Sequence, residues 1–129
     1  MYSMRETCQM AGLTYGTLKY YCNEGLVPGV KRDKNNYRVF DQRTVNWIKS
    51  LSCLKGCGMS IIEMKSYLAL CLEGESSIAE RKVMLNEKRE SLTNHINELN
   101  SYIDYIDHKN RFYDDVTSKK IKYESNLIY

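Results

Sequence analysis

The stretch that decides the fold is Leu13-Thr14-Tyr15-Gly16-Thr17-Leu18-Lys19-Tyr20-Tyr21, followed closely by Gly25-Leu26-Val27-Pro28. Thr14 belongs to the residue types that cap helix N-termini, and Gly25 to those that follow helix ends, so a short helix is expected between them. Leu18 lies three residues before Tyr21 and four before Cys22, which places all three on one apolar face that can pack on a core.

The opposite face of this helix carries a cation, hydroxyls and phenols, which suit phosphate oxygens and base edges of DNA. Its candidate DNA-contacting residues are Thr14, Tyr15, Thr17, Lys19 and Tyr20. A solvated amphipathic helix has the same pattern, so the interpretation depends on the neighbouring segments.

The segment before this helix predicts a partner helix. Ser3 and Glu6 form a capping-box pattern, which predicts a helix start, and the helix is expected to reach Ala11. Gly12 then turns the chain directly into the next helix. Two short helices joined by a tight glycine turn predict a helix-turn-helix, whose second helix reads DNA.

Residues 30–40 predict a small hairpin, because short β-prone ends flank an Asp-Lys-Asn-Asn tip. Beside a recognition helix, a basic hairpin serves as a wing on the phosphate backbone. The candidate residues of the wing are Lys31, Arg32, Lys34, Tyr37 and Arg38. The alternative is a solvated loop.

The charge distribution agrees with a DNA-binding head. The net charge of the 129-residue chain is +3. Residues 1–55 hold nine Lys+Arg and four Asp+Glu, whereas residues 56–129 hold ten and twelve. The positive half contains the predicted reading helix, as expected for a phosphate-binding head on a neutral body.

Three further helix starts follow. Asp41 is expected to cap a helix that ends near residues 56–58, and Ser60 begins a capping box for a helix that closes by Gly74. A third capping box is predicted at Ser77, ahead of the longest periodic stretch.

That stretch has an a/d heptad pattern typical of a coiled coil. The seam residues expected at the dimer interface are Leu85, Leu92, Ile96, Leu99, Ile103 and Ile106. A helix over 78–115 would be about 57 Å long. The expected partner is a second copy of the chain, and the alternative is a packed bundle within one chain.

The fold class is therefore mainly α: a winged helix-turn-helix head and a long C-terminal helix for dimerisation. The expected domains are the head (1–74), the dimerisation helix (75–115) and a tail (116–129) that folds back as a short helix or frays. No membrane-spanning run or secretory leader is seen, so the expected location is the cytoplasm. No catalytic set, metal site or cofactor motif is found, and an enzyme is not expected.

Several of these segments together resemble the MerR family of bacterial transcription regulators. The matching residues are Thr17-Leu18-Lys19-Tyr20-Tyr21, Gly25-Leu26, Pro28, Asn36-Tyr37-Arg38-Val39-Phe40, Gly58-Met59-Ser60-Ile61 and the run from Gly74 to Arg81. The resemblance implies an antiparallel coiled-coil dimer that bends and untwists double-stranded promoter DNA for RNA polymerase. The family usually has Arg where Lys19 stands and Glu-Arg where this chain has Cys22-Asn23, which puts the operator preference in doubt.

Within the family, the resemblance is nearest to small aldehyde- and thiol-stress regulators, which carry a Cys in the helix after the wing. Cys53 falls at the matching position and is the sensor candidate, with Cys57 as a resolving partner. Two alternatives remain open. One is a small apolar ligand lined by Tyr67, Tyr102 or Tyr105, and the other is an architectural DNA-bending protein without an effector.

Overall fold

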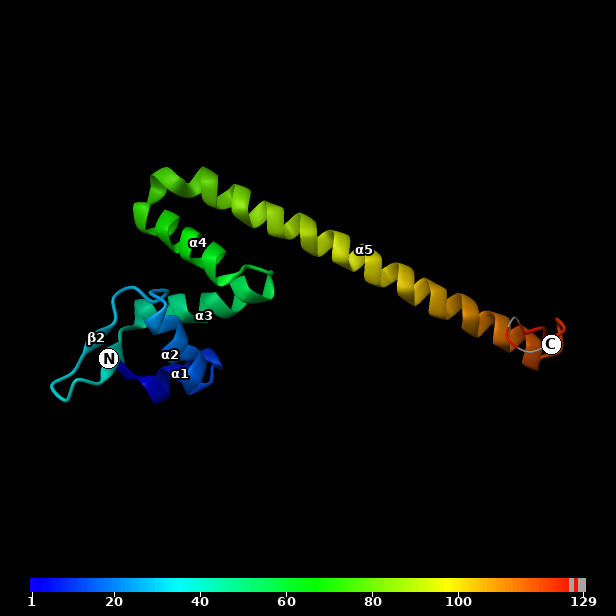
Figure 1. Cartoon of the computed structure of the whole chain (residues 1–129), viewed down its shortest axis with the longest axis horizontal. Helices are drawn as coiled ribbons and strands as arrows, with labels where there is room; N and C mark the ends of the chain where they lie inside the picture. The colour runs from blue at the N-terminus through cyan, green and yellow to red at the C-terminus, as the bar shows by residue number, and fades with distance from the viewer. Residues whose placement is uncertain (126, 128–129) are drawn as a thin grey trace. The chain divides into compact units, whose positions relative to one another are not determined.

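The computed structural model describes residues 1–125 and 127, and it divides into two compact units, Met1–Arg89 and Glu90–Tyr129. Figure 1 shows the order of the elements along the chain. The elements are β1 (Tyr2–Ser3), α1 (Met4–Ala11), α2 (Tyr15–Asn23), β2 (Lys31–Arg32), β3 (Arg38–Phe40), α3 (Gln42–Gly56), α4 (Ile61–Glu73), the 3-10 helix η1 (Glu75–Ser77) and α5 (Ile78–Thr117).

Local capping signals start the helices of the first unit where the sequence predicts them. The Ser3 hydroxyl accepts from the Glu6 amide, and the Glu6 carboxylate accepts from the Ser3 amide, both at 3.1 Å. Thr14 caps α2 by accepting from the Thr17 amide at 3.2 Å. The Asp41 and Ser60 caps of α3 and α4 are also confirmed. These bonds satisfy amides that have no partner inside the helix.

The core of the first unit lies where α1, α2 and α3 meet β3. Leu18, Leu26, Phe40 and Ile48 are fully buried, and each side chain stabilises the fold by about 1.5–3 kcal/mol through burial. The indole N–H of Trp47 donates to the Leu26 carbonyl at 2.7 Å. This bond joins α3 to the loop after α2, so the reading helix is held against α3.

The wing is one part of a three-stranded antiparallel sheet in the order β1-β3-β2. Strands β2 and β3 form the predicted hairpin, with Lys31 opposite Val39. Strand β1 was not predicted; it pairs with β3 and sets Tyr2 opposite Phe40. Only two residues long, it lacks a sequence period, so its pairing depends on the fold.

The third predicted capping box is wrong. Ser77 ends the 3-10 helix, which runs directly into α5, and its side chain is buried. The Ser77 hydroxyl donates to the carbonyls of Leu70 and Gly74 and accepts from the Arg81 side chain. Because these hydrogen bonds occupy the hydroxyl, it links the end of α4 to the first turn of α5 and does not cap α5.

The long helix α5 covers the predicted range and ends two residues later, at Thr117. Its first turns belong to the first compact unit, because Met84 packs on the core and Lys88 pairs with Glu63 at 2.7 Å. The predicted head boundary at residue 74 lies one residue after the end of α4, whereas this compact unit continues to Arg89.

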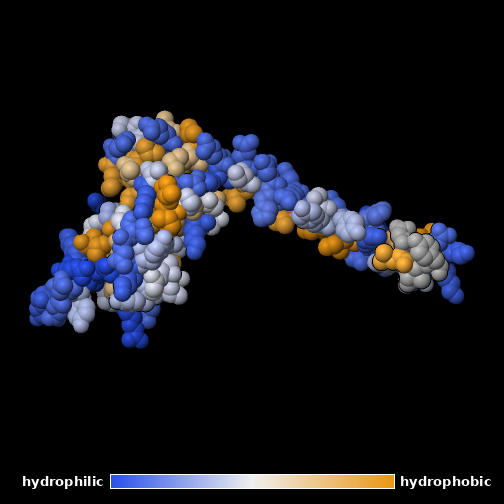
Figure 2. Space-filling view, in the orientation of Figure 1, coloured by the Kyte–Doolittle hydropathy of each residue, from blue (hydrophilic) through white to orange (hydrophobic). Residues whose placement is uncertain are grey.

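In the second unit the seam of α5 is uncovered. Every residue from 89 to 111 is exposed, and Figure 2 shows apolar side chains along α5.

After α5 the chain turns, with the Lys120 amide donating to the Asp115 carbonyl at 2.9 Å. Within the described part of the tail no further helix forms, and residues 126, 128 and 129 of the predicted tail lie outside the described residues. None of the described helices combines the length and apolar character needed to cross a bilayer.

Candidate DNA interface

The outer face of α2 is open. Tyr15 and Tyr20 are 58% and 47% exposed, and Lys19 is exposed as well. Within the described residues, the Lys19 ammonium has no hydrogen-bond or ion-pair partner. Thr17 differs, because it is half-buried and its hydroxyl accepts from the Thr14 hydroxyl at 2.9 Å. The face therefore offers one unpaired cation and two exposed phenols, and the two bonded threonine hydroxyls lie at the N-terminus of the helix.

The tip of the wing is held by its own side chains. The Asp33 carboxylate accepts from the amides of Asn35 and Tyr37 at 2.9 and 3.0 Å. Arg32 donates to the Asn36 carbonyl at 2.9 Å, and Asn36 has a φ of 65°, which asparagine tolerates. This closed tip leaves Tyr37 exposed, as are Lys31 and Lys34 of the predicted set.

One hydrogen bond joins the wing to the reading helix. Arg38 of β3 donates to the Asn23 side-chain oxygen at 2.8 Å. A guanidinium has five N–H donors, so this bond leaves others for a phosphate. Burial raises the pKa of the neighbouring Cys22 thiol, and the Arg38 charge opposes this rise. Arg38 and Asn23 are separate features of the sequence, and only the fold pairs them.

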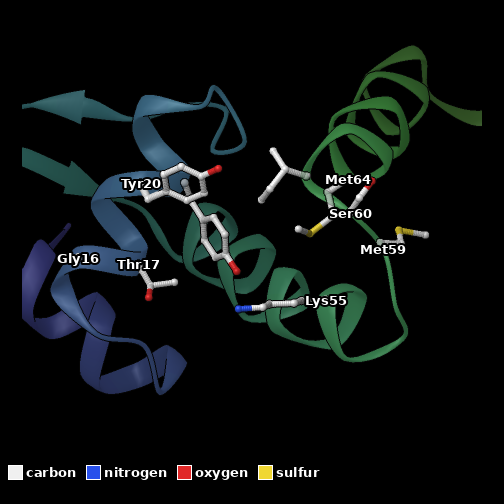
Figure 3. Close-up of a pocket in the computed structure, with 9 residues that line it drawn as sticks. Gly16, Thr17, Tyr20, Lys55, Met59, Ser60 and Met64 are labelled. Carbon is white, nitrogen blue, oxygen red and sulfur yellow. The ribbon is translucent and has the colours of Figure 1, made fainter.

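A groove of about 450 Å³ lies between α2 and the segment that joins α3 to α4. Its buried lining includes Met59, Met64 and Tyr21. Figure 3 shows Lys55 extending from α3 into this groove, with Thr17 and Tyr20 on the α2 side. Burial, and next the neighbouring Tyr20, raise the pKa of Tyr21, which favours the protonated hydroxyl that can donate a hydrogen bond.

No sequence pattern singles out Lys55 and Tyr21 as residues of this groove. Tyr21 was assigned to the core face of α2, and its side chain is indeed 2% exposed, yet it lines the groove. Lys55 lies in the last turn of α3, thirty-four residues further along the chain. The only sequence signal was a cation directly before the Gly56-Cys57-Gly58 turn.

The sensor candidates lie at the C-terminal end of α3. Cys53 is exposed and Cys57 is half-buried, and their backbones are linked by the Cys57 amide, which donates to the Cys53 carbonyl at 2.9 Å. Cys8, in contrast, is in the core, and burial raises the pKa of its thiol. Exposure makes Cys53 accessible to a reagent, which a buried thiol is not.

Comparison with known proteins identifies the family. A family model described as "MerR HTH family regulatory protein" matches residues 2–71. The chain belongs to the MerR family. A MerR-type chain of this kind is a transcription regulator, and the resemblance inferred from the sequence is confirmed.

Two curated relatives are regulators of the helix-turn-helix type. This MerR protein is 31% identical to an uncharacterized HTH-type transcriptional regulator of Haemophilus influenzae, over 87% of this chain and 83% of the relative. It is 33% identical to the HTH-type transcriptional regulator AdhR of Bacillus subtilis, over 70% of this chain and 64% of AdhR. Since its relatives regulate transcription, the expectation that this MerR protein is not an enzyme is supported.

Solved structures agree with the fold. HiNmlR, described as a MerR family regulator lacking the sensor domain and bound to promoter DNA, matches with a TM-score of 0.74 and 30% identity, over 91% of this chain and 93% of HiNmlR. A putative MerR family transcriptional regulator of Listeria monocytogenes matches with a TM-score of 0.80 and 28% identity, over 93% of this chain and 92% of that one. The mainly helical fold with a small wing and a long C-terminal helix is thus confirmed.

Proposed function

We propose that this MerR-family protein is a homodimer that binds double-stranded promoter DNA through α2 and the wing and controls transcription by RNA polymerase. The observation that carries the proposal is the hydrogen bond between Asn23 and Arg38, which joins the two DNA-facing elements into one basic surface. HiNmlR, which this chain resembles over most of its length, was solved on promoter DNA. A bacterial regulator of this kind would work in the cytoplasm, where the promoters and RNA polymerase lie.

The proposed contacts divide by chemistry. Tyr15, Lys19 and Tyr20 face base edges and phosphates from α2, while the wing grips the backbone with its cations. The Lys55 ammonium and the Tyr21 hydroxyl add donors for a phosphate at the groove beside α2. Phosphate contacts fix the register of a protein on the duplex, whereas contacts to base edges select the sequence.

The dimer is proposed because α5 carries an uncovered apolar seam. Leu85 and the five seam residues after it are 38–57% exposed in a single chain. Burying this seam against a second copy would connect two heads, and two connected heads bind two half-sites far more tightly than one head binds its own. An intrachain bundle would need another helix over residues 89–111, and none of the described elements covers them.

Cys53 is the proposed site of the effector response. Its thiolate would add to an electrophilic carbon, or be oxidised by a peroxide to a sulfenic acid that Cys57 then attacks, releasing water and forming a disulfide. Accessibility of Cys53 on α3 supports this. Because Ile48 and Leu51 of α3 lie in the same core as α2, a change in α3 would shift the reading helix.

The test combines DNA binding with transcription. The purified protein is titrated onto the promoter region upstream of its own gene, and RNA polymerase transcription from that promoter is measured with and without an aldehyde or peroxide. Sequence-specific binding with an effector-dependent change in transcript level is expected. Binding without any change in transcript would favour the architectural protein, and a response to apolar compounds alone would favour the ligand-binding regulator. No sequence-specific binding would contradict the proposal.

A further inference from the structure

The groove beside α2 has an apolar floor that the proposed DNA contacts leave unused. Met59 and Met64 line this floor with side chains that are 4% and 1% exposed, and Ile61 adds a half-buried apolar side chain. A phosphate is stabilised by hydrogen-bond donors and positive charge, whereas contact with an apolar wall costs it hydration. With a volume of about 450 Å³, the groove has the size of a small-molecule site. The floor therefore points to an occupant with an apolar body.

Two hydrogen-bond donors that lack partners open into the same groove. The Tyr21 side chain is 2% exposed, yet its hydroxyl has no hydrogen-bond partner among the described residues and is not fully enclosed. The Lys55 ammonium has neither a hydrogen bond nor an ion pair within the same residues, and Figure 3 shows this side chain reaching into the groove. Because a donor at a buried position is costly to leave without a partner, both groups favour an occupant that accepts hydrogen bonds and carries negative charge.

The apolar side chains of the groove are of the kinds that pack well on an aromatic ring. The rings of Tyr20 and Tyr21 lie 6.2 Å apart and are tilted by 45°. Aromatic rings gain stability from such tilted contacts, and methionine sulfur also contacts a ring favourably. Met59 and Met64 have flexible side chains, which adapt to the outline of a flat body. An aromatic group thus uses this floor better than a saturated chain does.

We propose that the groove binds a small aromatic carboxylate. Its carboxylate accepts from the Lys55 ammonium and the Tyr21 hydroxyl, while its ring packs on Met59 and Met64. The site differs from Cys53, the proposed point of the effector response, which does not line the groove. Because the carboxylate takes the two donors that the proposed function offers to a DNA phosphate, the ligand and the promoter compete. This competition rests on the proposed function, whereas binding of the ligand does not.

Binding of 2-naphthoate to the full-length, DNA-free protein tests the site. The matched ligand control is 2-naphthamide, which has the same ring system and no charge. In isothermal titration calorimetry we expect saturable binding of 2-naphthoate and at least about tenfold weaker binding of the amide, because the charge-assisted hydrogen bond is lost.

Two variants that keep the shape of the groove remove one donor each. Lys55→Met keeps an apolar stem and should weaken binding of 2-naphthoate about tenfold, and Tyr21→Phe keeps the ring and should weaken it about fivefold. Lys49→Met, also on α3 but outside the groove, is the control and should bind as the wild type does. Absence of saturable binding at millimolar 2-naphthoate would overturn the proposal, as would binding that neither donor variant weakens.

The methionine methyl groups report where the ligand binds. The chain has six methionines, and Met59 and Met64 line the groove. In NMR spectra of protein with ¹³C-labelled methionine methyl groups, 2-naphthoate should shift the signals of these two and leave that of Met10, which is exposed on α1, unchanged. Shifts confined to the other methionines would place the ligand elsewhere and contradict the proposal.

A gel-shift titration with promoter DNA tests the competition. At ten times its dissociation constant, 2-naphthoate should weaken promoter binding by the wild type about tenfold, and it should weaken binding by Lys55→Met far less. An unchanged promoter affinity at saturating 2-naphthoate would overturn the competition. If the ligand-free protein does not bind the promoter, the proposed function fails, whereas calorimetry and NMR still decide whether the groove binds the carboxylate.

Discussion

Lys19 presents an ammonium group on the open face of α2 with no partner in the described part of the protein. Lys19→Ala should weaken binding to the promoter by about tenfold at physiological salt and reduce the slope of log affinity against log salt by about 0.9, because one phosphate contact is lost. A gel-shift titration at two salt concentrations measures both quantities. Lys109→Ala, on the second unit, is the control. Equal affinity and slope for Lys19→Ala and wild type would remove Lys19 from the interface.

Arg38 donates a hydrogen bond to Asn23, and in the proposed interface it also supplies a positive charge for the DNA backbone. Arg38→Ala should reduce both affinity and salt slope, since it removes a cation. Asn23→Ala keeps every cation and releases the wing from α2, so affinity should fall by less, roughly threefold, while the salt slope stays unchanged. The same titration separates the two. If Asn23→Ala changed the slope as much as Arg38→Ala does, the positioning role of Asn23 would be wrong.

Replacing Cys53 is expected to change the transcriptional response to the effector and to leave the affinity for DNA unchanged. Cys53→Ser should bind the promoter as the wild type does and lose activation by an aldehyde or peroxide, because a hydroxyl does not replace a thiolate as nucleophile. A reporter assay with and without the reagent measures this. Cys8→Ser and Cys22→Ser are the controls and should respond normally. A normal response of Cys53→Ser would mean that its thiol is not the sensor.

Among the elements, α4 carries a carboxylate with two partners: Glu63 accepts from the Ser60 amide at the start of α4 and pairs with Lys88 of α5. Hydrogen bonding from Lys88, and next from the Ser60 amide, lowers the pKa of Glu63. A carboxyl whose pKa is lower in the folded state adds stability above its unfolded pKa, and this contribution is lost as the pH falls through the folded value. The midpoint of thermal unfolding should therefore fall in acid, and Glu63→Gln should reduce that fall. Unfolding followed by circular dichroism between pH 7 and about 3 tests this, with Glu73→Gln at the other end of α4 as the control.

For the whole molecule, the proposed dimer makes the contact between two copies decisive. Leu99→Asp should abolish dimerisation at micromolar concentration, because an unpaired carboxylate in the seam costs several kcal/mol. Promoter binding should weaken with it, since each head then binds its half-site alone. Light scattering measures the mass. Asp104→Asn, off the seam, is the control and should remain dimeric. A dimeric Leu99→Asp protein would exclude this seam as the interface.

The sequence by itself determined what depends on near neighbours. Thr14, Asp41 and Ser60 start their helices because a cap acts within three residues, and the heptads of α5 predict a long helix because its period is local. On α2, the burial of Leu18 and the exposure of Lys19 were also predicted correctly, since both follow from helical spacing, whereas Thr17 is half-buried.

Only the tertiary structure decided the contacts between distant segments. Three such arrangements are the strand pairing of Tyr2 with Phe40, the bond from Arg38 to Asn23, and the groove that Lys55 and α2 line together. No local pattern links the residues that they bring together. Ser77 shows the same effect through a prediction that is wrong. Its hydroxyl donates to the Leu70 carbonyl and accepts from the Arg81 side chain, so these contacts take the place of the predicted capping box. Short-range signals specify the elements, whereas hydrogen bonds and packing between elements depend on which surfaces the core brings together.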